Sequence, residues 1–169
     1  MSKPAKWTVK LQNSHAGRQI AYVIDRTNYI EYTVKNILEK YIGAMDGRSS
    51  FVRDVLLHSS VMALGQKFKV LQHIIQKEGW PTVSQDHFHM VLSIRNAFAH
   101  SDTATTKITV TLGSDGEPAS SEVLEVLDTL SSSGKFRELA RDKAFDEFLQ
   151  NFGPLREYLH DLDRNYAGK

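Results

Sequence analysis

The stretch from Gly17 to Gly43 constrains the fold more than any other part of the sequence. Apolar or small side chains recur there at spacings of three and four residues, which is the period of one face of an α-helix. This stripe consists of Ile20, Val23, Ile24, Thr27, Ile30, Val34, Ile37, Leu38 and Tyr41. Three tyrosines off the stripe, Tyr22, Tyr29 and Tyr32, indicate a second contact face. A helix with one apolar face needs partners, so we expect a bundle around it.

Three further helices are expected between residues 51 and 102. The first covers 51–64, after a serine cap at Ser49 or Ser50, and Gly65 should break it. The second covers 66–78 and should stop at the Gly-Trp-Pro sequence of 79–81. The third begins after Thr82 or Ser84 and carries the segment 89–102. Near the N-terminus, the alternation over 7–11 favours a short strand, with a helix as the alternative.

The second half of the chain predicts a β-hairpin and one more helix. Ile108, Val110 and Leu112 alternate with polar residues, and the small residues of 113–116 suit a turn. The return strand is expected at 122–127, although that segment also suits a short helix. The last helix is expected over 136–166, kinked or divided at Gly153 and Pro154. The predicted fold is mainly α, an up-and-down bundle of four to five helices in one domain (1–169), with a hairpin inserted at about 105–128.

Composition narrows the classes of function. The 21 basic and 20 acidic residues nearly cancel, so any contact with RNA must come from a local patch. The chain has no cysteine, which excludes disulfides and thiol catalysis. No secretion signal or run of about 18 apolar residues is present, which predicts a cytoplasmic protein without membrane contact. Neither a glycine-rich phosphate loop nor a helix-turn-helix signature is found, so sequence-specific DNA binding is not expected.

The segment HMVLSIRNAFAHSD, residues 89–102, joins an apolar stripe to charged and titratable groups. We assign Phe88, Val91, Leu92 and Ala99 to the stripe, which places Arg95 where an aliphatic residue would be expected. Burying a cation is costly unless it is paired, so Arg95 should meet a carboxylate, a ligand or another subunit. His100 lies about 140° around a regular helix from Arg95. Either the helix loosens near Ala99, or a second copy of the chain brings the two groups together.

Arg95, Asn96 and His100 resemble the signature of HEPN domains, an arginine followed after four to six residues by a histidine, often with a polar residue directly after the arginine. One segment is most similar to the branch of mannitol operon repressor-like proteins: the sequence IRNAFAH, which follows a helix containing LGQKFKVLQHI. The resemblance covers 17–102 and, more loosely, the C-terminal helix. The inserted hairpin departs from the plainest four-helix form of the family.

These residue types suit RNA cleavage without a metal or another cofactor. An imidazole exchanges protons near neutral pH, so His100 would act as general base or acid on the 2′-hydroxyl that attacks the adjacent phosphate. Arg95 would stabilise the charge that builds on the phosphate, and Asn96 would orient Arg95 or bind a phosphate oxygen. The motif supplies only one histidine per chain for the two roles of acid and base, so a homodimer that brings two copies together is expected. The resemblance also implies such a dimer, in a toxin, defence or stress-response setting.

Several alternatives stay open. The repressor-like branch includes members that act as regulatory modules, so the resemblance also implies a non-catalytic dimer that works by binding a protein partner, whereas an antitoxin partner would fit the toxin reading. Arg95 would instead form a salt bridge with Asp102 or Glu31 if its role were structural, with His100 at the helix C-terminus. A nucleotide-binding module is a third possibility.

Weak RNA contacts are predicted at Lys67, Lys69 and Lys77. His87 and His89 point to nearly opposite sides of a helix, so no metal site is expected.

Overall fold

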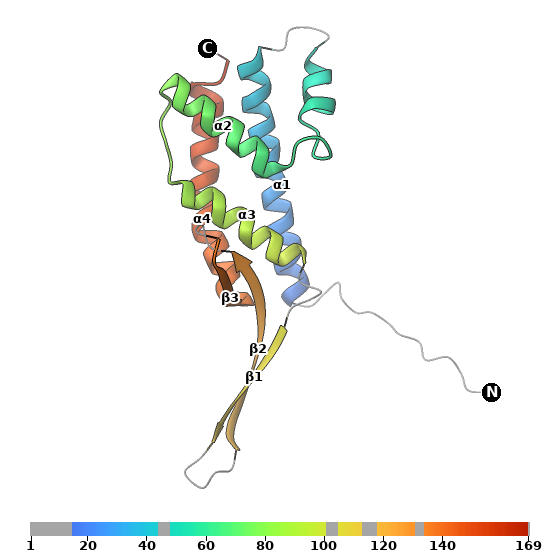
Figure 1. Ribbon diagram of the computed structural model, residues 1–169, viewed down its shortest axis with the longest axis vertical. Coiled ribbons are helices and arrows are strands. Elements are labelled where there is room, and N and C mark those ends of the chain that lie inside the picture. Colours follow the sequence, from blue (N-terminus) through green and yellow to red (C-terminus); the bar gives the residue numbers. More distant parts are fainter. Residues whose placement is uncertain (1–14, 44–47, 101–104, 113–117, 131–133, 169) are drawn as a thin grey trace, which may run out of the picture.

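The computed structural model describes residues 15–43, 48–100, 105–112, 118–130 and 134–168. Its elements follow one another along the chain in a simple order (Figure 1). They are the helix α1 (His15–Ile42), the short π-helix η1 (Phe51–Leu56), the helices α2 (Leu64–Glu78) and α3 (Gln85–Ala99), the strands β1 (Thr105–Leu112), β2 (Pro118–Leu130) and β3 (Phe136–Ala140), and the helix α4 (Arg141–Asn165). The prediction of a mainly α bundle with an inserted hairpin is confirmed.

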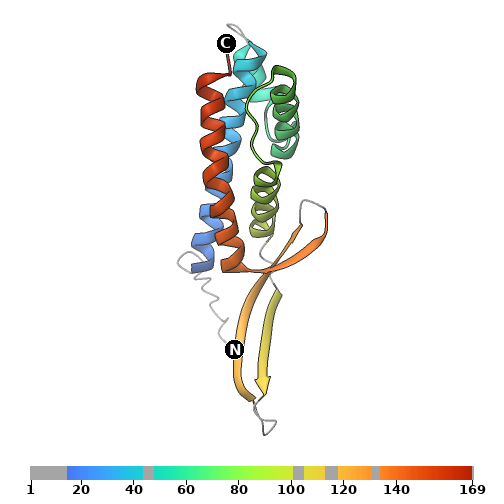
Figure 2. The same cartoon turned by 90° about the vertical axis from the view of Figure 1, so that its left-hand side faces the viewer.

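The two long helices α1 and α4 lie side by side and form the spine of the bundle. In Figure 2 the shorter helices α2 and α3 lie one above the other along one side of this pair. The apolar stripe of α1 faces α4, α2 and α3, so most of the residues predicted from its periodicity are buried. Val23, Ile30, Val34, Ile37 and Leu38 are fully enclosed, as are Leu155, Leu159 and Leu162 of α4. Each such side chain contributes about 1.5–3 kcal/mol by leaving water.

The ends of the middle helices follow their sequence signals. Ser84 is the N-cap of α3, and its hydroxyl accepts a hydrogen bond from the backbone N–H of Asp86 at 3.3 Å. Gly79 ends α2 with φ of 66°, the left-handed conformation that glycine adopts most easily. These two signals therefore fix the corner between α2 and α3.

The helix predicted over 51–64 is wrong in extent. Only Phe51–Leu56 is helical after the serine pair, and α2 already begins at Leu64, so Gly65 lies inside a helix. His58 gives a physical reason, because its Nδ1 lies 2.7 Å from the Ser60 hydroxyl and accepts the Ser60 backbone N–H at 3.2 Å. Local bonds of this kind satisfy the backbone in a turn and compete with helix formation.

The hairpin is confirmed and is longer than predicted. β1 pairs antiparallel with β2 from Thr105 opposite Val126 to Leu112 opposite Pro118, and this arm extends well beyond the bundle (Figure 1). β2 continues to Leu130 and pairs there with β3. The final helix was predicted to begin at Phe136, which is wrong, because Phe136–Ala140 forms β3 and α4 starts at Arg141. Pairing with β2 places Leu139 opposite Leu127, and both are buried.

Two further predictions concern the proline in the last helix and the strand near the N-terminus. α4 runs as one helix through Gly153 and Pro154, so the proline does not divide it. The strand predicted at 7–11 lies outside the described residues. Among the helices that the structure describes, none has both the length and the apolar character needed to cross a bilayer.

Candidate functional site

The buried stripe of α3 differs from the predicted one. The side chains that it buries are Phe88, Val91, Ile94, Ala97 and Phe98. Ile94 and Phe98 are fully enclosed, whereas Ala99 is exposed. The prediction that Arg95 occupies a core position is therefore wrong. Adjacent residues are 100° apart on a helix, so placing Ile94 inward leaves Arg95 at the edge of the buried face.

Arg95 and Asn96 form a hydrogen-bonded pair on the surface of α3. Arg95 Nη1 donates to Asn96 Oδ1 at 3.1 Å, which gives the guanidinium a preferred orientation. Arg95 is half-buried and Asn96 is exposed. Glu31, one of the two carboxylates considered for a salt bridge, is bonded to Lys67 instead. The other, Asp102, lies outside the described residues. Arg95 has no ion pair within the part of the chain that the structure describes.

His100 lies where α3 ends. It is the C-cap residue, with φ of −105° and ψ of 20°, and its backbone N–H donates to the carbonyls of Asn96 and Phe98. The α-helix therefore ends at Ala99, and the two arrangements expected from the angle between Arg95 and His100 both stay predictions. His100 is exposed, so the helix end presents an amide, a guanidinium and an imidazole within six consecutive residues.

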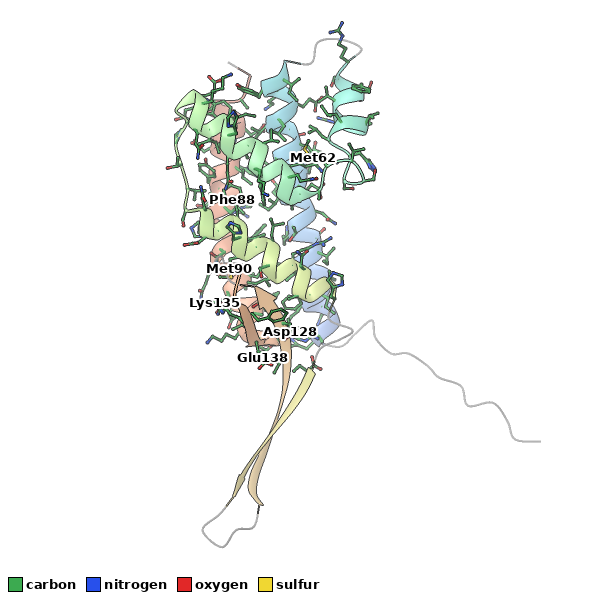
Figure 3. The ribbon with its side chains drawn as sticks, viewed as in Figure 1. Met62, Phe88, Met90, Asp128, Lys135 and Glu138 are labelled. Carbon is green, nitrogen blue, oxygen red and sulfur yellow. The ribbon has the colours of Figure 1, made fainter. Side chains whose placement is uncertain are left out.

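The inner end of the sheet lies beside this part of the bundle. Figure 3 labels Asp128 from β2 and Glu138 from β3, with Lys135 just before β3 and Met90 on α3 above them. Asp128 and Glu138 are register partners across the two strands. Like charges placed opposite one another are unfavourable, so a nearby ammonium is expected to help this pair. This corner of the molecule is mixed in charge and offers no uniformly basic surface.

The three lysines predicted to contact RNA do not form one patch. Lys67 is fully buried, and its ammonium bonds to the Glu31 carboxylate. The prediction that it contacts RNA is wrong, because the enclosed ammonium cannot reach a phosphate. Lys69 and Lys77 are exposed, and Lys77 Nζ donates to the Tyr41 hydroxyl at 3.2 Å. That hydrogen bond is the main cause that raises the pKa of Lys77.

Sequence reasoning missed a hollow between α1 and α4. Its volume is about 490 Å³, and it is lined by Arg26, Tyr29, Arg156, Glu157, His160, Asp161, Arg164 and Asn165. The signal was present in the sequence, because Arg156, His160 and Arg164 recur every four residues on one helical face. Tyr29, one of the off-stripe tyrosines, forms part of its wall. None of the lining residues belongs to α3, so this hollow and the Arg95 site are separate features.

Comparisons with known proteins found no relative of this chain. No family model, curated protein or solved structure matches this chain. The resemblance to HEPN domains therefore stays a prediction, supported by its residues. Within the described residues, no group of three or more His, Asp or Glu side chains is arranged to hold a metal ion.

Proposed function

We propose that this chain is a HEPN-like endoribonuclease that works as a homodimer without a metal ion. The observation that supports this best is the exposed end of α3, where Asn96 orients Arg95 and His100 follows at the C-cap. A structural role would be satisfied by buried groups. Cleavage instead requires a guanidinium and an imidazole that a phosphate can reach, and the exposure of His100 and the position of Arg95 at the edge of the buried face support that requirement.

The reaction would be an attack of the RNA 2′-hydroxyl on the adjacent phosphorus. The O2′–P bond forms, the P–O5′ bond breaks, and the products are a 2′,3′-cyclic phosphate and a 5′-hydroxyl. A base removes the proton from O2′ and an acid protonates O5′, so two titratable groups act in one turnover. His100 of each subunit would supply one of them. Arg95 would bind the phosphate oxygens through its planar fork, with Asn96 as a positioning residue.

The test is incubation of the purified protein with labelled RNA in EDTA, beside His100→Ala and Arg95→Ala. His89→Ala is the matched control, because His89 is an exposed histidine on the same helix. Both motif variants should lose cleavage by at least about 100-fold, the usual contribution of general acid–base catalysis, while His89→Ala keeps it. Light scattering should show that all four proteins are dimers. Absence of wild-type cleavage across pH values from about 5 to 8 would contradict the proposal.

One observation favours a second candidate, a non-catalytic regulatory module. The β1–β2 arm extends away from the bundle and begins at Thr105, five positions after His100 (Figure 1). An extended arm of this kind suits contact with a regulatory protein partner. The test replaces 108–123, the part of the arm outside the β2–β3 pairing, with a short glycine linker. A wild-type protein that is inactive but co-purifies with a partner, and a variant that loses this partner, would support this second function.

A further inference from the structure

Three guanidinium groups face one hollow on the spine of the bundle. Arg26 comes from α1, and Arg156 and Arg164 come from α4. The hollow between them, at about 490 Å³, falls within the usual size range of small-molecule sites. Arginine forks match the geometry of phosphate oxygens, which accept two parallel hydrogen bonds from one guanidinium.

The two carboxylates of the hollow already have partners within it. Arg156 Nη2 lies 3.7 Å from Glu157 Oε1, and the Asn165 amide donates to Asp161 Oδ1 at 2.6 Å. The Arg164 guanidinium makes no ion pair or hydrogen bond with the residues that the structure describes. The charge of Arg164 is therefore left without a carboxylate among the described residues, and Arg26 has only a long ion pair with Asp25.

Arg26 gives the second reason to expect an anion. Its Nε is buried, yet no hydrogen-bond acceptor for it exists among the described residues. The nearest carboxylate, that of Asp25, lies 3.9 Å away, which is too long for a hydrogen bond. Its guanidinium carbon lies 5.1 Å from the centre of the Tyr22 ring, a cation–π contact that helps to hold the group in place. The side chain as a whole is 43% exposed, so its guanidinium is open to an anion in the hollow, while its Nε lacks an acceptor among the described residues.

Tyr29 and His160 complete the wall. The Tyr29 hydroxyl lies 2.6 Å from His160 Nε2, and the two rings are 5.7 Å apart. This pair joins α1 to α4 across the hollow and holds its two sides at a fixed separation. A rigid wall lowers the cost of ordering side chains when a ligand binds.

We infer that this hollow binds the phosphate group of a small phosphorylated molecule. Arg26 and Arg164 donate to the phosphate oxygens, and the carboxylates of Glu157 and Asp161 disfavour a longer polyanion such as an RNA strand. The site shares no residue with the Arg95 site. Failure of this inference therefore leaves the proposed ribonuclease untouched, and the reverse also holds.

The probe is inorganic pyrophosphate, titrated into the full chain at constant ionic strength and followed by calorimetry and by NMR chemical shifts. Saturable binding to the wild type is expected. Arg26→Gln and Arg164→Gln should each raise the dissociation constant about tenfold or more, as loss of a charged hydrogen bond does. Arg18→Gln, which removes an exposed arginine of α1 outside the hollow, should leave the dissociation constant unchanged.

Thermal unfolding of each variant shows whether it is folded, and Arg164→Lys provides a second variant that keeps the charge but loses the fork. Its affinity should fall between those of the wild type and Arg164→Gln. Two outcomes overturn the inference at the level of the site: no saturable binding at millimolar pyrophosphate, or an equal loss in Arg18→Gln. Displacement of pyrophosphate by a short oligoribonucleotide, with the same dependence on Arg26 and Arg164, would overturn the assignment to a small molecule.

Discussion

The ammonium of Lys67 on α2 is fully buried and bonds to the carboxylate of Glu31 on α1, 36 residues earlier in the chain. Side-chain exposure is 0% for Lys67 and 20% for Glu31, so the carboxylate supplies the only edge of the pair near water. Such a pair adds little net stability over apolar residues, but breaking it leaves a buried charge. The two helices are therefore tied at this point by a requirement for charge balance.

Glu31→Gln should destabilise the protein by about 3 kcal/mol, because the buried ammonium loses its counter-charge. Lys67→Met should cost less, since Glu31 can turn its carboxylate to water. The measurement is urea denaturation. Asp163→Asn, which removes an exposed ion pair with Lys40, is the control and should cost at most about 1 kcal/mol. A Glu31→Gln loss no larger than that of the control would contradict this reading of the pair.

Two nearby positions of α3, Ile94 and Leu92, test which stripe is buried. Ile94→Ala should cost about 2–5 kcal/mol, because Ile94 is fully enclosed and its loss leaves a cavity. Leu92→Ala should cost clearly less, since Leu92 is only half-buried. Denaturant unfolding of the two variants gives the order directly. The reverse order would restore the stripe that the sequence pattern predicts and place Arg95 back on the core face.

Gly65 and Gly79 form a matched pair with opposite expectations. An added Cβ meets only Leu92 Cδ1, at an ordinary contact distance of 3.7 Å, at Gly65 and no atom within 4 Å at Gly79. Gly65 is inside α2, so Gly65→Ala should stabilise the protein by about 0.5–1 kcal/mol. Gly79 has φ of 66°, so Gly79→Ala should destabilise it by about 1–2 kcal/mol despite the open space. Thermal melts of both variants check the signs, and equal signs would mean that backbone conformation does not decide the effect.

Glu39 should make stability depend on pH in the acid range. The hydrogen bond from the Ser49 hydroxyl lowers the pKa of Glu39 below its ordinary 4.5, burial opposes the shift, and Arg53 adds to it. Since the folded pKa is the lower one, the ionised group stabilises the native state above pH 4.5. That contribution disappears as the pH falls through the folded pKa. Glu39→Gln should therefore flatten the stability profile between pH of about 5 and 2.

The control for Glu39 is Asp54→Asn, which removes an exposed carboxylate from η1. It should leave the acid limb of the profile nearly unchanged. Ser49→Ala should raise the pKa of Glu39, which a carbon-detected NMR titration of its carboxyl group can follow. An unchanged pKa in Ser49→Ala would show that the hydroxyl is not the main cause of the shift.

Local sequence signals predict the structural features that depend only on residues close together in the chain, such as the ends of helices. Ser84 and Gly79 mark helix ends through bonds and backbone angles that involve only a few residues. The sequence pattern places the edge of the α3 stripe one position off, because spacings of three and four residues fit Arg95 as well as Ile94. The pattern of Phe136–Ala140 predicts helix, because its pairing with β2 is not visible in the segment itself. Burial of Lys67 likewise depends on Glu31, a partner that composition cannot reveal.

For the candidate site, too, some features could be predicted from the sequence and others needed the structure. Arg95, Asn96 and His100 could be selected from sequence because they are close together in the chain. Their placement at an exposed helix end needed the structure, because it depends on where α3 stops. The hollow of Arg26 and Arg164 joins the first and last helices, so no local window contains it.

The side-by-side arrangement of α1 and α4 also sets the order of events during synthesis. α1 leaves the ribosome first, but Leu155, Leu159 and Leu162, which belong to the bundle's core, follow roughly a hundred residues later. At ordinary translation rates this is a delay of about 5–20 s. Throughout that interval the apolar face of α1 lacks α4, so the nascent chain is an expected client of chaperones that cover exposed apolar helices.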